Sequence, residues 1–124
     1  MSERNKAVVR RLVDEVFNGG RMEVIDELFA ATLAPEAKRW ITPFQASFPD
    51  MHMDVIDLIA EDDKVVGRFI CSGTHLGEWL GHAPTGRRFE AVDEVSIYRF
   101  NDGKIIHAWG IEDTLGRLEQ LGLG

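Results

Sequence analysis

The sequence predicts an α+β fold in which three N-terminal helices pack on one face of a strongly curved antiparallel sheet. Apolar residues recur every three to four positions in the first part of the chain, and they alternate with polar residues after Pro49. A length of 124 residues with 44% hydrophobic residues fits one domain with one core. We therefore treat residues 1–124 as a single domain and expect one pocket, between the helices and the curved sheet.

The three expected helices follow one another along the chain. The first runs from Lys6 to Phe17, where apolar residues have helical spacing, and residues 18–20 (NGG) end it. Residues 22–30 repeat the pattern and predict a second, shorter helix. The third begins at Pro35, a residue suited to the first helical turn, and Pro43 must kink or end it.

Two hairpins are expected after the helices. Residues 53–59 alternate, an acidic turn (EDDK) follows, and residues 65–73 form the returning strand. The second hairpin consists of residues 89–100, a turn at NDG, and residues 104–113. Between the hairpins, residues 75–88 are rich in Gly and Pro and predict a loop or a broken strand.

The register of the second hairpin decides which side chains face the pocket. A two-residue primed turn would unite five side chains on one face: Glu94, Ser96, Tyr98, His107 and Trp109. A three-residue loop with Gly103 in the left-handed bulge position would instead align Asp93, Val95 and Ile97 with His107, Trp109, Ile111 and Asp113. We prefer the second register because it gathers more apolar side chains on one face. The pocket face then carries Asp93, His107 and Asp113, and Glu112 points away from it.

Asp113 has two interpretations that do not exclude each other. A carboxylate on an apolar face is costly unless it is paired, hydrogen-bonded or protonated, and burial raises its pKa, which makes it a candidate general base. Asp113 also directly precedes TLGRLEQL and is suited to cap that helix, a role worth about 1 kcal/mol. His107 is either a hydrogen-bond partner of Asp113 in the pocket or a satisfied core histidine.

Composition and motif content exclude several classes of function. The net charge of −7 disfavours nucleic acid and anionic membranes as partners. The opening residues lack the apolar run of a signal peptide and no apolar stretch is long enough to span a bilayer, so we expect a cytoplasmic protein. The four histidines and the single cysteine have no metal-ligand spacing, and no phosphate-binding loop precedes a helix. We expect neither a metal nor a cofactor.

Most of the second half of the chain resembles the SnoaL-like polyketide cyclase family. The similarity extends from Phe48 to Gly122, and several short motifs carry it together: FPD before the first strand, GTHLG, PTG, DGKI, a Trp four positions before Asp113, and QLG. The resemblance implies a cone-shaped fold like that of nuclear transport factor 2 and ketosteroid isomerase, assembled as a homo-oligomer (dimer or tetramer). It also implies an enzyme that closes a ring by intramolecular aldol condensation without metal or cofactor, with Asp113 at the position of the family's catalytic Asp.

The remaining candidate residues would bind a hydrophobic small-molecule substrate. Four aromatic side chains are candidates for stacking on a flat ligand, although such residues are also typical of a core: Trp40, Phe44, Trp79 and Trp109. His75 either lines the pocket mouth or anchors its loop. Asp93 is either a second polar group of the site or a buried partner of Arg87, Arg88 or Arg99.

Two alternatives to the cyclase keep the same fold. One is an isomerase or an epoxide-opening enzyme, since each of these reactions also needs a buried carboxylate. The other is a non-catalytic binding or dimerisation module in which Asp113 only caps a helix.

Overall fold

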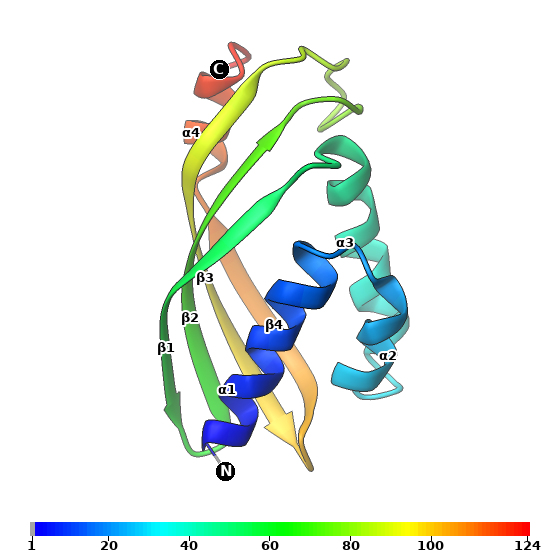
Figure 1. The fold of residues 1–124 in the computed structure, drawn as a ribbon, viewed down its shortest axis with the longest axis vertical. Helices are drawn as coiled ribbons and strands as arrows, with labels where there is room; N and C mark the ends of the chain where they lie inside the picture. The colour runs from blue at the N-terminus through cyan, green and yellow to red at the C-terminus, as the bar shows by residue number, and fades with distance from the viewer. Residues whose placement is uncertain (1) are drawn as a thin grey trace.

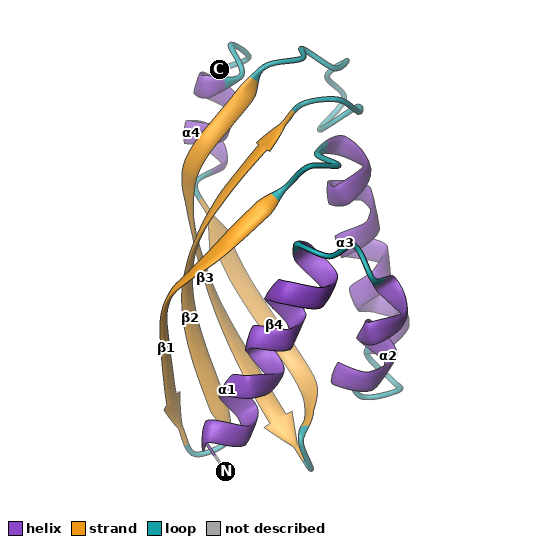
Figure 2. Ribbon diagram, in the orientation of Figure 1, coloured by secondary structure: helices purple, strands orange, loops and turns teal. Residues whose placement is uncertain are grey.

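The computed structural model describes residues 2–124 and contains helices packed against one four-stranded sheet (Figures 1 and 2). In chain order the elements are α1 (Ser2–Arg11), η1 (Leu12–Phe17), η2 (Met22–Val24), α2 (Ile25–Leu28), α3 (Ala34–Ser47), β1 (His52–Glu61), β2 (Lys64–Thr74), β3 (Arg88–Asn101), β4 (Lys104–Glu112) and α4 (Thr114–Gln120). The predicted α+β class is confirmed, with three helical segments before the first strand.

The helical segments cover one face of the sheet. α1 continues directly into η1, a π-helical turn that ends where the amide of Asn18 donates to the carbonyl of Val13 (2.8 Å). Figure 1 shows this continuous helix lying across the concave side of the strands, with α2 and α3 farther out. The side chains that fill the space between these helices and the sheet form the core, for example Val9, Val16, Phe69 and Ile105.

Of the two outcomes expected at Pro43, a kink or the end of the third helix, the ending does not occur, because the helix continues to Ser47. A proline inside a helix removes the hydrogen bond to the carbonyl four residues earlier, here that of Arg39. Pro43 and Arg39 are both exposed, so water can replace that bond. At the end of the helix the hydroxyl of Ser47 donates to the carbonyl of Pro43 (3.1 Å).

The sheet is an antiparallel meander in the order β1-β2-β3-β4. In Figure 1 the strands twist strongly from one end to the other, and α4 packs beside the beginning of β3. The segment between β2 and β3 is a loop closed on itself, because the amide of His75 donates to the carbonyl of Arg87 (2.9 Å) and that of Gly86 to the carbonyl of His75 (2.9 Å).

The hairpin of β3 and β4 combines parts of both predicted registers. Asp102 and Gly103 have φ values of 51° and 76°, as a two-residue primed turn requires, so the preferred three-residue loop is wrong. The pairing is irregular between Arg99 and Phe100, so that Ile106 is an extra residue in β4. As a result Trp109 lies opposite Ile97 and Ile111 opposite Val95, which are the strand partners of the preferred register.

The prediction that these paired residues face the pocket is also wrong. The residues that alternate with them on β3 turn toward the helices, and Tyr98 and Phe100 are buried there. Trp109 and Ile111 are 51% and 62% exposed, and His107 is exposed as well. The concave face therefore carries Glu94, Ser96 and Tyr98, while Asp93, Val95 and Ile97 belong to the outer face.

Candidate functional site

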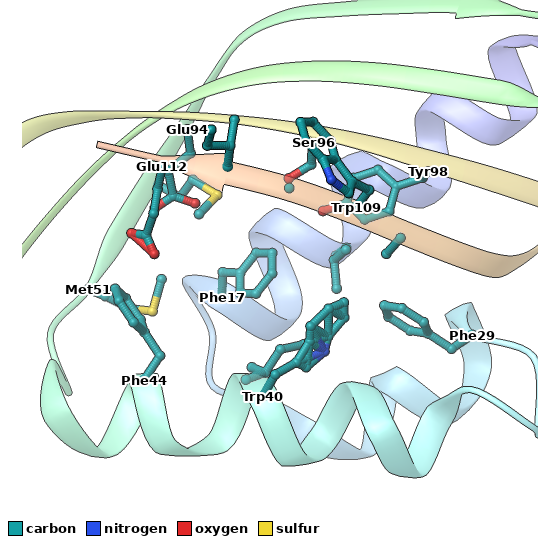
Figure 3. A pocket seen from close by; sticks show the side chains of 16 residues that line it. Phe17, Phe29, Trp40, Phe44, Met51, Glu94, Ser96, Tyr98, Trp109 and Glu112 are labelled. Carbon is teal, nitrogen blue, oxygen red and sulfur yellow. The ribbon is translucent and has the colours of Figure 1, made fainter. Parts of the chain in front are cut away.

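A cavity of about 310 Å³ lies between the concave face of the sheet and α3 (Figure 3). Helical side chains form one wall, among them Phe17, Trp40 and Phe44, and the strands β3 and β4 form the other. Trp40 and Trp109 are both among the lining residues and are 45% and 51% exposed, Trp109 with its side chain on the outer face of β4. The lining residues are Leu12, Phe17, Phe29, Trp40, Ile41, Phe44, Met51, Met53, Glu94, Ser96, Tyr98, Ala108, Trp109, Gly110, Ile111 and Glu112.

Two carboxylates line one end of this largely apolar cavity, and a buried guanidinium group lies behind them. Glu94 on β3 and Glu112 on β4 are cross-strand partners, and Arg117 on α4 forms ion pairs with both. Nη2 of Arg117 lies 3.3 Å from Oε2 of Glu94, and Nη1 donates to Oε1 of Glu112. The Arg117 side chain is fully buried, whereas those of Glu94 and Glu112 keep 17% and 34% of their surface exposed.

Aromatic rings hold the guanidinium group of Arg117 in place. Its Cζ atom lies 4.6 Å from the ring centre of Phe89, 4.9 Å from that of Phe44 and 5.5 Å from that of Trp79. Its Nε atom has no hydrogen-bond partner among residues 2–124. Because a planar cation stacks favourably on aromatic faces, these rings fix Arg117 between the two carboxylates.

Burial changes the proton affinity of the groups around Glu94. Desolvation, and secondly the negative charge of Glu112, raise the pKa of Glu94 from 4.5 to about 7, although Arg117 opposes the shift. Burial also raises the pKa of the neighbouring Cys71 thiol to about 12 and that of the Tyr98 hydroxyl to about 12. Glu94 is therefore a carboxyl group that takes up and releases a proton near neutral pH.

The two predicted catalytic residues do not line the cavity. The carboxylate of Asp113 is exposed and caps α4, accepting a hydrogen bond from the amide of Gly116 (2.9 Å). His107 is exposed on the outer face of the sheet, opposite Arg99. The expectation that Glu112 points away from the pocket is wrong, since Glu112 lines it.

The predicted substrate-binding residues divide into three groups. Trp40, Phe44 and Trp109 line the cavity. Trp79 is buried in the adjoining aromatic cluster, against Phe48 and Arg117. Neither Asp93 nor His75 belongs to the lining.

Asp93 and His75 have structural partners instead. Asp93 is exposed and forms an ion pair of 2.8 Å with Arg68, instead of a buried pair with Arg87, Arg88 or Arg99. His75 is fully buried, and its Nδ1 accepts a hydrogen bond from the amide of Thr85 (3.1 Å). His75 thus anchors the loop between β2 and β3, which was one of its two predicted roles.

Sequence reasoning missed the charged end of the cavity for identifiable reasons. Glu94, Ser96 and Tyr98 were named together only in the register that was not preferred. The signal for Arg117 is its position four residues before Leu121 in the last helix, since both lie on the buried side of α4. A charged residue at a core position of an amphipathic helix indicates a buried partner, and two acids lie in the strands nearby.

The described residues offer no evident metal centre. Among residues 2–124, no group of three or more His, Cys, Asp or Glu side chains is arranged to hold a metal ion. None of the helices in this part of the chain is long and apolar enough to cross a membrane.

Comparison with known sequences assigns the chain to a family. The sequence profile of the SnoaL-like polyketide cyclases matches residues 7–121. The chain belongs to this family. The SnoaL-like sequence is 31% identical to the aklanonic acid methyl ester cyclase AcmA of Streptomyces galilaeus over 112 residues, which cover 87% of this chain and 72% of AcmA. It is 30% identical to the aklanonic acid methyl ester cyclase DnrD of Streptomyces peucetius over 108 residues, with the same two coverages, 87% and 72%.

Solved structures agree with the SnoaL-like fold. IdmH from Streptomyces antibioticus superposes with a TM-score of 0.81 at 30% identity, covering 95% of this chain and 98% of IdmH. TsrD from Streptomyces laurentii gives a TM-score of 0.91 at 24% identity, covering 100% of this chain and 98% of TsrD. The family resemblance drawn from the sequence is confirmed, and cyclases among the relatives indicate an enzyme of that kind.

Proposed function

We propose that the protein is a cofactor-independent cyclase that closes a ring in a polyketide-like carbonyl ester by intramolecular aldol condensation, with a carboxylate as acid and base. One observation carries this proposal: an apolar, aromatic-lined cavity ends at a carboxyl group whose pKa is about 7. A general acid-base group is most effective when its pKa lies near the working pH. Relatives described as aklanonic acid methyl ester cyclases support the choice of reaction.

The shape of the cavity fits one end of a flat substrate. Its volume of about 310 Å³ is at the lower limit of the roughly 300–1,000 Å³ typical of pockets for drug-sized ligands. A fused aromatic ring system is therefore enclosed only in part, and the remainder extends past the half-exposed Trp40. Phe44 contacts the enclosed part, so that stacking holds the reacting chain in one orientation.

The reaction needs no group beyond a carboxylate and hydrogen-bond donors. A carbon flanked by two carbonyls gives up a proton to the carboxylate, and the resulting enolate attacks a second carbonyl of the same molecule. Folding one substrate so that its two ends meet supplies much of the rate enhancement. That this carboxylate is Asp113, assisted by His107, stays a prediction. Neither residue lines the cavity, so both would have to act on the substrate from outside it.

Assembly into a homo-oligomer is part of the proposal. The outer face of the sheet carries four apolar side chains, of which Trp109 and Ile111 are exposed and Val95 and Ile97 half-buried. Exposed apolar patches of this kind are typical of protein interfaces. We propose that two copies pack through this face, which would also cover one side of Trp109.

The proposed activity is tested by incubating the protein with aklanonic acid methyl ester. The ring-closing carbon–carbon bond forms without loss of water, so the expected product has the mass of the substrate but a different chromatographic retention. The Phe44→Ala variant, which removes one stacking wall, should raise KM at least tenfold. Binding of the ester without any change in retention would refute the cyclase and favour a binding module.

A further inference from the structure

We propose that Glu94 is the acid and base of this site, and that Arg117 and Glu112 are positioning residues that hold its carboxyl group at the end of the cavity. This inference rests on the proposed function, because it names the group that moves the proton in that reaction. It differs from the assignment of Asp113, and the two can be separated by experiment.

The position of Glu94 gives its carboxyl group access to a bound substrate. Glu94 lies on the concave face of β3 and lines the cavity together with Ser96 and Tyr98, its neighbours on the same face (Figure 3). Residues two apart on a strand are separated by about 7 Å. A substrate along this strand therefore meets the carboxyl of Glu94 at one end and the hydroxyls of Ser96 and Tyr98 beside it.

The surroundings of Glu94 suit proton transfer. Four groups from four elements face it: Cys71 from β2, Tyr98 from its own strand, Glu112 from β4 and Arg117 from α4. Burial and Glu112 favour the protonated form, whereas Arg117 favours the ionised form. Burial and Glu112 outweigh Arg117 and bring the pKa of Glu94 to about 7, so that both forms of Glu94 are populated near neutral pH.

Glu112 is less suited to be the base, because its carboxylate accepts directly from Nη1 of Arg117 and is more exposed. Asp113 is exposed and its carboxylate accepts from the backbone of α4, so it has neither the burial nor the placement. Glu94 makes the longer of the two contacts to Arg117 and faces the cavity.

One residue can complete the proton balance of the reaction. The ionised Glu94 takes the proton from the carbon between two carbonyls, and the electron pair of that C–H bond moves into the enolate. The enolate carbon then bonds to the second carbonyl carbon, whose π electrons move to its oxygen. Glu94 returns the same proton to this oxygen, which becomes the hydroxyl of the product, and the site is ready for the next substrate.

The test compares three isosteric variants of the full chain with aklanonic acid methyl ester as the substrate. Glu94→Gln keeps the shape and the contact to Arg117 but cannot transfer a proton, so kcat should fall at least 100-fold. The Kd of the ester, followed by tryptophan fluorescence, should change less than about threefold. Glu119→Gln is the matched control, because Glu119 is exposed on α4 and away from the cavity lining. Asp113→Asn keeps a helix cap and removes the charge, which isolates any chemical role of Asp113.

A second readout separates the role of Arg117 from simple stabilisation. In Arg117→Lys the cation is kept but the two-pronged geometry is lost. The pH at which kcat is half-maximal should then shift, and kcat should fall about tenfold or more with KM nearly unchanged. A purely structural Arg117 would lower the amount of folded enzyme without moving the pH profile.

A direct titration of the Glu94 carboxyl group tests the proposed role of Glu94 even if the protein does not convert the ester. The carboxyl carbons of 13C-labelled glutamate are followed by NMR against pH, with Glu94→Gln to assign the signal. A Glu94 signal that titrates near neutral pH and shifts when the ester binds supports the proposal. If the wild type closes no ring, the cyclase proposal fails for this ester while the titration still decides on Glu94.

Two results would overturn the assignment. Ring closure that survives in Glu94→Gln, with a loss in Asp113→Asn instead, would return the role to Asp113. A Glu94 carboxyl that titrates with the ordinary glutamates and ignores the ester would exclude it as the acid and base.

Discussion

The raised pKa of Glu94 predicts how the free energy of unfolding changes with pH, and this can be measured without a substrate. Folding raises the pKa of Glu94 from 4.5 to about 7, so the folded state binds this proton more tightly than the unfolded state does. The extra stability is fully present below pH 4.5 and is lost as the pH rises toward 7. Each pKa unit corresponds to about 1.4 kcal/mol, so the shift is worth about 3 kcal/mol at most.

The comparison with Glu94→Gln isolates this effect from all other titrating groups. The variant side chain has the same shape and does not titrate between pH 4.5 and 8. The free energy of unfolding of the wild type relative to the variant should therefore fall by about 3 kcal/mol across this range. Urea denaturation followed by tryptophan fluorescence at several pH values measures both proteins under identical conditions.

The same experiment with Glu119→Gln supplies the baseline. Glu119 is exposed, so the difference between this variant and the wild type should stay nearly constant with pH. If the difference in free energy of unfolding between the wild type and Glu94→Gln is equally constant with pH, the reasoning is refuted. Burial and Glu112 would then not raise the pKa of Glu94. A difference that grows with pH would contradict even the sign of the shift.

Four further results are expected from the same structure. Cys71 is buried with a pKa of about 12, so a thiol reagent at pH 8 should modify it only after unfolding, as measured by mass spectrometry. Removing the cation with Arg117→Met should cost about 3–5 kcal/mol of stability, because Glu94 and Glu112 lose their shared partner; urea denaturation measures this loss. The cavity end carries two carboxyls, with one guanidinium behind them, so a free-acid analogue should bind at least tenfold more weakly than the neutral ester in a fluorescence titration at pH 8. Ile111→Glu on the outer sheet face should lower the molar mass measured by light scattering if that face is the interface between copies, and an unchanged mass would argue against it.

The helices and strands were predictable because their apolar spacing is local. Residues 6–17, for example, form the end of α1 and all of η1, and residues 89–100 lie within β3. The sequence did not decide whether Pro43 kinks or ends its helix, because the cost of an interior proline depends on whether water can reach the freed carbonyl, and spacing along the chain does not reveal that. The family was recognisable from motifs in the second half of the chain.

The facing of the second hairpin was not predictable from alternation. Both faces of β3 carry apolar residues, Val95 and Ile97 on one and Tyr98 and Phe100 on the other, so the number of apolar residues does not identify the buried face. In addition, Ile106 is an extra residue in β4, so the two-residue turn does not by itself determine which residues of β3 and β4 lie opposite each other. The side-chain period of a strand is two residues, so choosing the wrong face shifts the prediction by one position. Asp93 was therefore predicted to line the cavity, whereas Glu94 lines it in the structure.

The ribosome makes α4, which carries Arg117, after all four strands of the sheet. α4 follows the whole sheet in the chain, and it alone brings the guanidinium group between the two carboxyls. A ribosome-bound chain that has already emerged up to Glu112 contains every strand but not yet the cation. During that interval the two glutamates are neighbours without a counter-charge, and their mutual repulsion opposes closure of the hairpin end. The ion-pair cluster is thus completed only by α4, so a nascent chain with a formed sheet lacks the cation that holds Glu94 and Glu112 until α4 has docked.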